Sequence, residues 1–158
     1  MRQKDGLVLR KAHGNDVSQM CALLMDGAAK GLLLPRSQAQ LFAALRDFFV
    51  VEDPEAGTIV GCSALAIIWE GMAEVRSLYV LEDYRREGLG RKLVQACLED
   101  AVLFGMTRVF TLTYQTSFFA GLGFAEVPKE SLPQKIWTDC IHCPKFPNCD
   151  EVAMIRSV

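Results

Sequence analysis

The chain has 158 residues, of which 51% are hydrophobic and 23% charged, and its formal net charge is −2. This length suits one domain with a sizeable core, which we expect to span residues 1–158. The small net charge gives no general attraction to nucleic acid. The longest strongly apolar run, Cys62–Trp69, is too short to cross a bilayer. No apolar signal-peptide core follows the first residues, so we expect a cytoplasmic protein whose six cysteines are thiols or metal ligands rather than disulfides.

The first half of the chain predicts one strand, two helices and two further strands, each bounded by turn or cap residues. In chain order these are a strand at 7–10, a helix capped by Asn15 or Asp16 that ends near Met25 before Gly27 and Gly31, a helix from Ser37 to Leu45, and strands at 48–51 and 58–68. The segment Asp53–Gly57 contains proline and glycine and joins the last two as a hairpin turn.

The second half predicts a strand at 74–80, a long helix up to Gly105, a strand at 109–113 and a short helix ending at Gly121. A last short strand follows, within the part of the chain that ends at about residue 127. In the long helix, apolar residues recur at helical spacing at Leu89, Leu93, Ala96, Cys97 and Val102. Cys21, Cys62 and Cys97 lie in apolar patterns and are expected in the core.

A basic segment that contains glycine joins the strand at 74–80 to the long helix. It reads Arg85-Arg86-Glu87-Gly88-Leu89-Gly90, followed by Arg91-Lys92. A helix begins there, so its first backbone N–H groups are unpaired and the helix dipole adds partial positive charge. Such an end binds phosphate, and glycine lets the backbone approach the ligand closely. No Gly-Lys-Ser/Thr follows the glycines, so the segment is not a P-loop.

The spacing Arg85-x-x-Gly88-x-Gly90 resembles the acetyl-CoA pyrophosphate loop of the Gcn5-related N-acetyltransferases (GNAT). The later Phe118-Phe119-x-x-x-Gly123-Phe124 is similar to the family's aromatic helix that ends in Gly-Phe. The predicted order β-α-α-β-β-β-α-β-α-β over residues 7–127 is also that of the family. The resemblance therefore implies an α/β (α+β) fold of the acyl-CoA N-acyltransferase type, with a central mixed twisted sheet flanked by helices.

This resemblance implies that acetyl-CoA is the co-substrate, bound by the end of one strand and the loop after it. The residues that match the family's cofactor positions are Leu78, Tyr79, Val80, Arg85, Arg86, Glu87, Gly88, Leu89, Gly90, Arg91 and Phe119.

Three further segments resemble the amino-acid N-acetyltransferases that make N-acetylglutamate: 31–37, 61–65 and 132–135. This likeness implies acetyl transfer to the α-amino group of glutamate, in arginine biosynthesis. Two carboxylates on the substrate require cationic partners, and Arg36, Lys135 and Lys145 match the regions where the family has them. The family often has a basic residue after the segment at 61–65, but Ala66-Ile67-Ile68 is apolar. A related amino acid is therefore an open alternative.

The same resemblance implies the catalytic roles. Glu74 matches the base that takes a proton from the amine, directly or through one water. The backbone N–H of Leu78 matches the group that stabilises the developing oxyanion, and the carbonyl of Ser77 holds the incoming amine. Thr113 matches a hydroxyl that protonates the leaving thiolate, with Tyr114 as the neighbouring alternative.

The tail at about 130–151 contains Cys140, Cys143 and Cys149, with His142 beside the second cysteine. Three thiols with this spacing are consistent with zinc, which prefers four ligands or three and a water. Reduced thiols in a packed loop are the alternative, and we assign no metal.

The expected function is thus an acetyl-CoA-dependent amino-acid N-acetyltransferase. Its partners are small molecules, with no nucleic acid and no membrane, and a homodimer is left open. Three alternatives are an acetyltransferase for another small amine or a protein N-terminus, an acetyl-CoA-binding sensor without turnover, and a metal- or redox-sensing module built on the tail.

Overall fold

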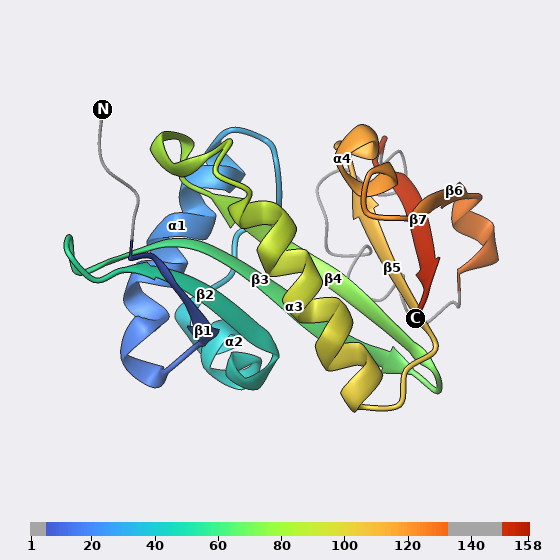
Figure 1. Ribbon diagram of the computed structural model, residues 1–158, viewed down its shortest axis with the longest axis horizontal. Coiled ribbons are helices and arrows are strands. Elements are labelled where there is room, and N and C mark those ends of the chain that lie inside the picture. The colour runs from blue at the N-terminus through green and yellow to red at the C-terminus, as the bar shows by residue number, and fades with distance from the viewer. Residues whose placement is uncertain (1–5, 133–149) are drawn as a thin grey trace. The chain divides into compact units, whose positions relative to one another are not determined.

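The computed structural model describes residues 6–132 and 150–158 (Figure 1). Seven strands form one hydrogen-bonded sheet in the order β1-β2-β3-β4-β5-β7-β6. The strands are β1 (Val8–Lys11), β2 (Phe48–Asp53), β3 (Thr58–Trp69), β4 (Met72–Val80), β5 (Arg108–Thr113), β6 (Ala125–Val127) and β7 (Val152–Ser157). The α-helices are α1 (Val17–Ala29), α2 (Gln38–Ala43), α3 (Leu89–Leu103) and α4 (Thr116–Ala120). Short 3-10 turns occur at η1 (Gly14–Asp16), η2 (Leu45–Asp47), η3 (Glu82–Tyr84) and η4 (Lys129–Ser131).

Backbone contacts divide the chain into two compact units. Unit 1 comprises Met1–Leu65 and Ser77–Cys97, and unit 2 comprises Ala66–Arg76 and Leu98–Val158. The mixed α/β fold confirms the prediction. Among the described residues, no helix is both long and apolar enough to span a membrane.

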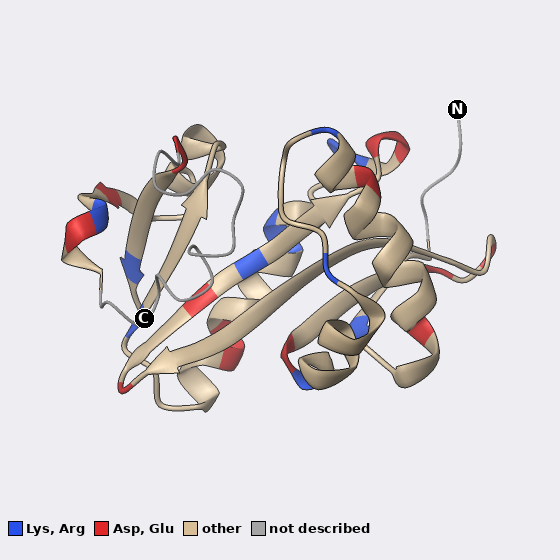
Figure 2. Ribbon diagram, turned by 180° about the vertical axis from the view of Figure 1, so that it is seen from behind, with Lys and Arg blue, Asp and Glu red and all other residues tan. Residues whose placement is uncertain are grey.

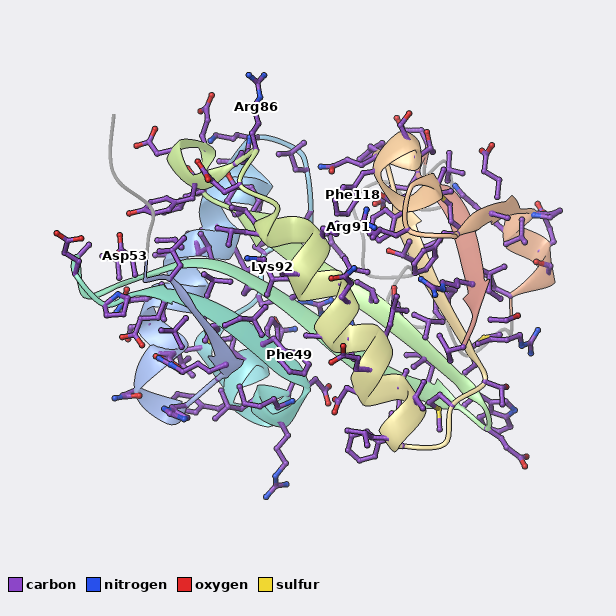
Figure 3. The ribbon with its side chains drawn as sticks, viewed as in Figure 1. Phe49, Asp53, Arg86, Arg91, Lys92 and Phe118 are labelled. Carbon is purple, nitrogen blue, oxygen red and sulfur yellow. The ribbon has the colours of Figure 1, made fainter. Side chains whose placement is uncertain are left out.

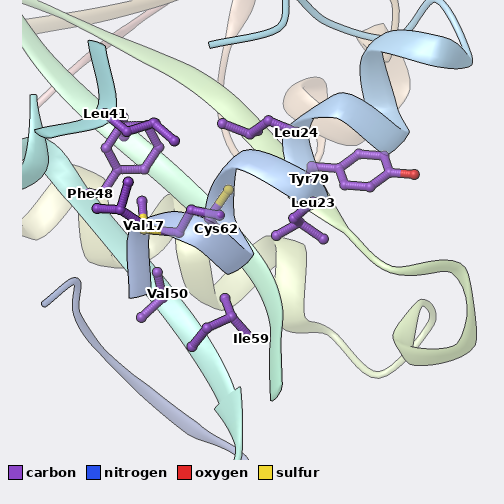
Figure 4. Close-up of a cluster of buried hydrophobic side chains, with 11 residues drawn as sticks. Val17, Leu23, Leu24, Leu41, Phe48, Val50, Ile59, Cys62 and Tyr79 are labelled. Carbon is purple, nitrogen blue, oxygen red and sulfur yellow. The ribbon is translucent and has the colours of Figure 1, made fainter. Parts of the chain in front are cut away.

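Unit 1 has a core on each face of its strands. Alternate residues of β2 point to opposite faces, as the period of a strand requires: Val50 belongs to one cluster and Val51 to the other. The first cluster packs α1 and α2 against the sheet (Figure 4). The second packs the beginning of α3, through Leu89 and Leu93, against the opposite face. Both clusters reach β4, through Tyr79 and Val80 respectively.

The beginning of α1 differs from the prediction. Asp16 is not the capping side chain of α1; it closes the preceding turn η1 by accepting a hydrogen bond from the His13 backbone N–H at 2.7 Å. The Arg10 guanidinium donates two hydrogen bonds to the same carboxylate, at 2.7 and 3.0 Å. Arg10 is the main cause of the lowered pKa of Asp16. The capping group of the second helix is confirmed, since the Ser37 hydroxyl accepts from the backbone N–H of Gln40.

The end of α1 also differs. Gly27 does not break the helix, which continues to Ala29; Gly31, with φ of 72°, follows its end. Gly27 is buried because the ring of Tyr79 lies against it: a Cβ there would come within 2.9 Å of the Tyr79 Cδ1. The sequence shows a helix-breaking residue type, whereas the position requires glycine for close packing.

Unit 2 is completed by a strand that the sequence analysis missed. β7 pairs antiparallel with all six residues of β5 and also with β6. It therefore lies between two elements that precede it in the chain. The buried cluster of this unit joins Met72, Phe110 and Ala153, from β4, β5 and β7, with Leu132, which follows η4.

The predicted apolar face of α3 is wrong at Val102, the last residue assigned to it. Val102 is 59% exposed, whereas its neighbour Ala101 is fully buried and Leu98 is 7% exposed. Cys62 and Cys97 lie in the core as predicted, and Cys21 is half-buried with its thiol donating to the Arg36 carbonyl.

Candidate functional site

The loop between β4 and α3 has the backbone of an anion-binding turn. Arg86 and Gly88 both have positive φ, 68° and 76°. The first helical hydrogen bond of α3 runs from the Lys92 N–H to the Gly88 carbonyl. The N–H groups at the first turn of α3 precede that bond, so helix geometry leaves them without an intrahelical acceptor. A phosphate is the ligand that such an N-terminus favours.

The cations of this loop do not behave alike. Arg86, Arg91 and Lys92 are exposed, and Arg86 extends away from the loop into solvent (Figure 3). Arg85 is exposed as well, but its side chain turns back to β4, where its Nε donates to the Val80 carbonyl at 2.9 Å. Its guanidinium also lies over the Tyr79 ring, 5.3 Å from the centroid. The Arg85 side chain thus holds the loop against its strand, while the other cations face outward. Over residues 6–132 and 150–158, charges of both signs are mixed along the elements (Figure 2).

A buried tyrosine anchors the middle of the loop. Tyr84 is 4% exposed, and its hydroxyl donates to Asp53 Oδ2 at 2.7 Å. Asp53 is itself only 3% exposed and ends β2. This hydrogen bond ties the turn η3 to the last residue of β2, where the β2–β3 hairpin turns. The loop therefore enters α3 from a fixed position.

Tyr79 links β4 to the end of α1. Its ring is buried in the first cluster, and its hydroxyl points away from that cluster (Figure 4). The hydroxyl donates to Asp26 and accepts from Lys30 Nζ at 3.3 Å. Burial and the Asp26 hydrogen bond raise the pKa of Tyr79, while the Tyr79 hydroxyl and Lys30 lower the pKa of Asp26. The side chain thus positions the α1 terminus that leads into residues 31–36.

Ser77 has a strained backbone. Its φ is 56°, and among the described residues other than glycine only Arg86 shares a positive φ. Such conformations cost about 1–3 kcal/mol and concentrate where ligands bind. The Ser77 carbonyl accepts a hydrogen bond from the Cys62 thiol at 3.3 Å, and burial raises the pKa of that thiol to about 12. The thiol is therefore neutral at physiological pH and acts as a donor to the strained carbonyl.

Unit 2 contains Glu74 and Thr113, two of the predicted catalytic residues. The Glu74 side chain is 12% exposed, and its Oε1 lies 3.7 Å from Arg76 Nε. Thr113 is 8% exposed, and its Oγ1 accepts from the backbone N–H of Gln115 at 2.9 Å. Tyr114, the alternative hydroxyl, is 36% exposed and donates to Asp150.

Phe119 is buried in unit 2, at 3% exposure, with edge-to-face contacts to Phe118 and Phe124. This packing stabilises α4 and the turn after it. Its predicted contact with the cofactor stays a prediction.

The comparisons with known proteins address the family directly. The model of the acetyltransferase (GNAT) family matches residues 20–125. The chain belongs to this family. A curated but uncharacterized GNAT relative, an N-acetyltransferase of Chlorobaculum tepidum, is 41% identical over 152 residues, which is 95% of this chain and 96% of that protein.

Named relatives indicate the branch of the GNAT family. An amino-acid acetyltransferase of Mycobacterium tuberculosis is 36% identical over 121 residues, 76% of this chain and 69% of that protein. Among solved structures, N-acetylglutamate synthase from Neisseria gonorrhoeae, complexed with coenzyme A and N-acetyl-glutamate, is 25% identical with a TM-score of 0.85. The match covers 98% of this chain and 36% of the synthase. The resemblance to amino-acid acetyltransferases is therefore confirmed.

The roles of Arg36, Lys135 and Lys145 in this GNAT site stay predictions. Arg36 is half-buried, at the end of the segment after α1. Lys135 and Lys145 lie outside the described residues, as do the tail cysteines and His142. Within residues 6–132 and 150–158, no cluster of three or more His, Cys, Asp or Glu side chains is arranged to bind a metal.

Sequence reasoning missed two side chains that lie beside the candidate residues. Arg76 lies on the same face of β4 as Glu74, and its position two residues away was the available signal. Tyr84, which precedes the loop segment Arg85–Gly90, was not singled out. No local pattern predicts that its hydroxyl reaches Asp53, because the two residues are far apart in sequence.

Proposed function

We propose that this GNAT protein transfers the acetyl group of acetyl-CoA to the α-amino group of an amino acid, with glutamate as the preferred substrate. The observation that carries the proposal is the N-terminus of α3, where positive φ at Gly88 and exposed cations are features that favour a pyrophosphate. The acceptor is supported by the amino-acid acetyltransferase of Mycobacterium tuberculosis and by the gonococcal synthase.

The loop residues fit the acyl donor in charge and in shape. Among the predicted positions, Arg86 and Arg91 supply exposed cations, and the α3 N-terminus supplies backbone N–H donors. A Cβ on Gly88 would meet no atom within 4 Å, so the space there is open to a ligand. The proposed role of Arg85 is different, since its side chain braces the loop.

Glu74 is the proposed base. An α-ammonium group must lose a proton before its nitrogen can attack, and a half-buried carboxylate is suited to accept it. The new bond joins that nitrogen to the acetyl carbonyl carbon, and the bond from this carbon to sulfur breaks. The Leu78 N–H stabilises the charge on the carbonyl oxygen. The Ser77 carbonyl orients the amine, and the Thr113 hydroxyl or solvent returns a proton to the thiolate.

The substrate carboxylates are assigned to Arg36, Lys135 and Lys145. Guanidinium and ammonium groups are the cations that proteins use for this purpose. The side-chain carboxylate of glutamate distinguishes it from glutamine, and a site built for it should discriminate by about 1–3 kcal/mol.

Release of free CoA thiol by purified protein tests the proposal, with glutamate, glutamine, aspartate, leucine and a peptide with a free N-terminus as acceptors. Glutamate should have the highest kcat/KM. Glu74→Gln should lower kcat by ~10²-fold, whereas Glu99→Gln, at an exposed position of α3, should leave kcat unchanged. Preference for the peptide would assign the chain to protein N-termini, and turnover of none would indicate a sensor. Either result contradicts the proposal.

A further inference from the structure

Glu74 and Arg76 form an ion pair on one face of β4. They are two residues apart, so their side chains leave the strand on the same side. The Arg76 Nε lies 3.7 Å from Glu74 Oε1, and the side chains are 26% and 12% exposed. The intervening Val75 is buried on the other side. A carboxylate and a guanidinium are thus held next to each other at a half-buried position.

The contact between Arg76 Nε and Glu74 Oε1 is longer than a charge-assisted hydrogen bond. A charge-assisted hydrogen bond has a donor–acceptor distance near 2.7–2.9 Å, and arginine pairs best through two parallel bonds. The chain makes such a fork between Arg10 and Asp16, at 2.7 and 3.0 Å. Between Arg76 and Glu74 the Nε contact is an ion pair too long for a hydrogen bond. The two groups are close enough for their charges to influence each other.

The position of the pair also points to a ligand. The parallel ladder between β4 and β5 runs from Met72–Arg108 to Glu74–Phe110. Glu74 is thus in the last pair, and Arg76 lies two residues beyond it. The next residue, Ser77, has the strained φ of 56°, and such strain is concentrated at binding sites.

The chemistry of the pair matches one class of compound. A free α-amino acid carries an ammonium and a carboxylate on a single carbon. A protein carboxylate accepts hydrogen bonds from the ammonium, and a guanidinium binds the carboxylate. Adjacent opposite charges on one strand face are therefore complementary to the head group of an amino acid, and partial burial strengthens both interactions.

We propose that Glu74 and Arg76 together bind the α-ammonium and the α-carboxylate of the substrate, and that Arg76 selects acceptors with a free α-carboxylate. This inference rests on the proposed function and names a residue that the function did not use. Arg76 also supplies a cation in place of the basic residue that the apolar segment 66–68 of β3 lacks. The two strands are adjacent in the chain, because the two-residue turn Glu70-Gly71 joins β3 to β4. The side-chain carboxylate then falls to the remaining cations.

The test compares glutamate with its α-amide, which keeps the amine and the side-chain carboxylate but has no α-carboxylate. In the wild type, kcat/KM should favour glutamate by at least tenfold. Arg76→Gln should lower kcat/KM for glutamate about 10- to 100-fold, mainly through KM, and change the value for the α-amide less than about threefold. Arg76→Lys should restore part of the preference, because it returns the charge without the fork.

The matched control is Arg108→Gln, at the exposed first residue of β5, which should leave both substrates unaffected. An unchanged Kd for acetyl-CoA shows that Arg76→Gln is folded. The inference is overturned if Arg76→Gln keeps the wild-type preference for glutamate over its α-amide. It is also overturned if kcat/KM falls equally for both substrates, because that result indicates an effect through Glu74 alone. If the wild type itself acetylates no amino acid, the proposed function fails with it, and that result is visible before any variant is made.

Discussion

Tyr84→Phe tests how strongly one buried hydroxyl anchors the loop between β4 and α3. The substitution removes one hydroxyl, which donates to Asp53 Oδ2 at 2.7 Å, and keeps the buried ring. A hydrogen bond to a charged group is worth about 1.5–3 kcal/mol. Asp53 keeps its 3.4 Å contact from the Ala56 N–H. We therefore expect the free energy of unfolding to fall by about 2 kcal/mol and Tm by roughly 4–8 °C.

Urea unfolding of Tyr84→Phe, Asp53→Asn and the double variant measures the coupling between the two groups, which should exceed about 1 kcal/mol. Tyr114→Phe is the matched control, because that hydroxyl also donates to an aspartate at 2.7 Å but on the surface. It should cost less than about 0.5 kcal/mol. The Kd for acetyl-CoA should rise several-fold in Tyr84→Phe. Equal stability of the two tyrosine variants would refute the anchoring role of Tyr84.

Three further predictions concern glycines and one carboxylate. Gly88→Val should raise the Kd for acetyl-CoA by about tenfold or more, roughly 1.4 kcal/mol. The control is Gly57→Val, in a hairpin turn with φ of 68° and equally open surroundings, which should lose similar stability but keep the wild-type affinity for acetyl-CoA. Equal affinity in both variants would contradict the assignment of the loop to the cofactor. Gly27→Ala should destabilise by up to about 2 kcal/mol despite its better helix propensity, because the added Cβ lies 2.9 Å from a buried ring; a gain in Tm would show that the helix moves away. The pKa of Asp16 is lowered from 3.8, so its contribution is present above that value and is lost as pH falls through the folded pKa. In urea titrations, the free energy of unfolding of Arg10→Gln should therefore fall less steeply than that of the wild type between about pH 5 and pH 2. An equally steep fall in both proteins would show that Asp16 does not contribute to acid unfolding.

Most elements could be predicted because their signals are local. Ser37 and Gln40 form a capping box within four residues, and the turn at 53–57 contains its own proline and glycine. The loop from Arg85 to Gly90 could be identified for the same reason. The predicted helix boundaries were wrong where tertiary packing determines the residue type. Gly27 lies inside α1 rather than ending it, because a larger residue would meet the Tyr79 ring.

The candidate site residues could be named from the sequence, but the contacts that their side chains make could not. Arg85 looked like a phosphate ligand, and only the fold shows its Nε on the Val80 carbonyl. Ser77 was chosen for its carbonyl, but the positive φ and the Cys62 thiol behind it have no sequence signature. β7 was missed although Val152-Ala153-Met154-Ile155 is an apolar run, because nothing local indicates that it is inserted between β5 and β6.

The insertion of β7 sets the order in which this part of the protein acquires structure during translation. β5 and β6 leave the ribosome well before the strand that separates them, and β6 pairs in the sheet with β7. Until β7 is synthesised, β5 therefore exposes the edge on which six residue pairs later form, and an exposed edge is a template for pairing with another chain. A nascent or truncated chain that stops before Val152 is thus the species most prone to aggregate, and expression yield should depend on this strand more than its six residues suggest.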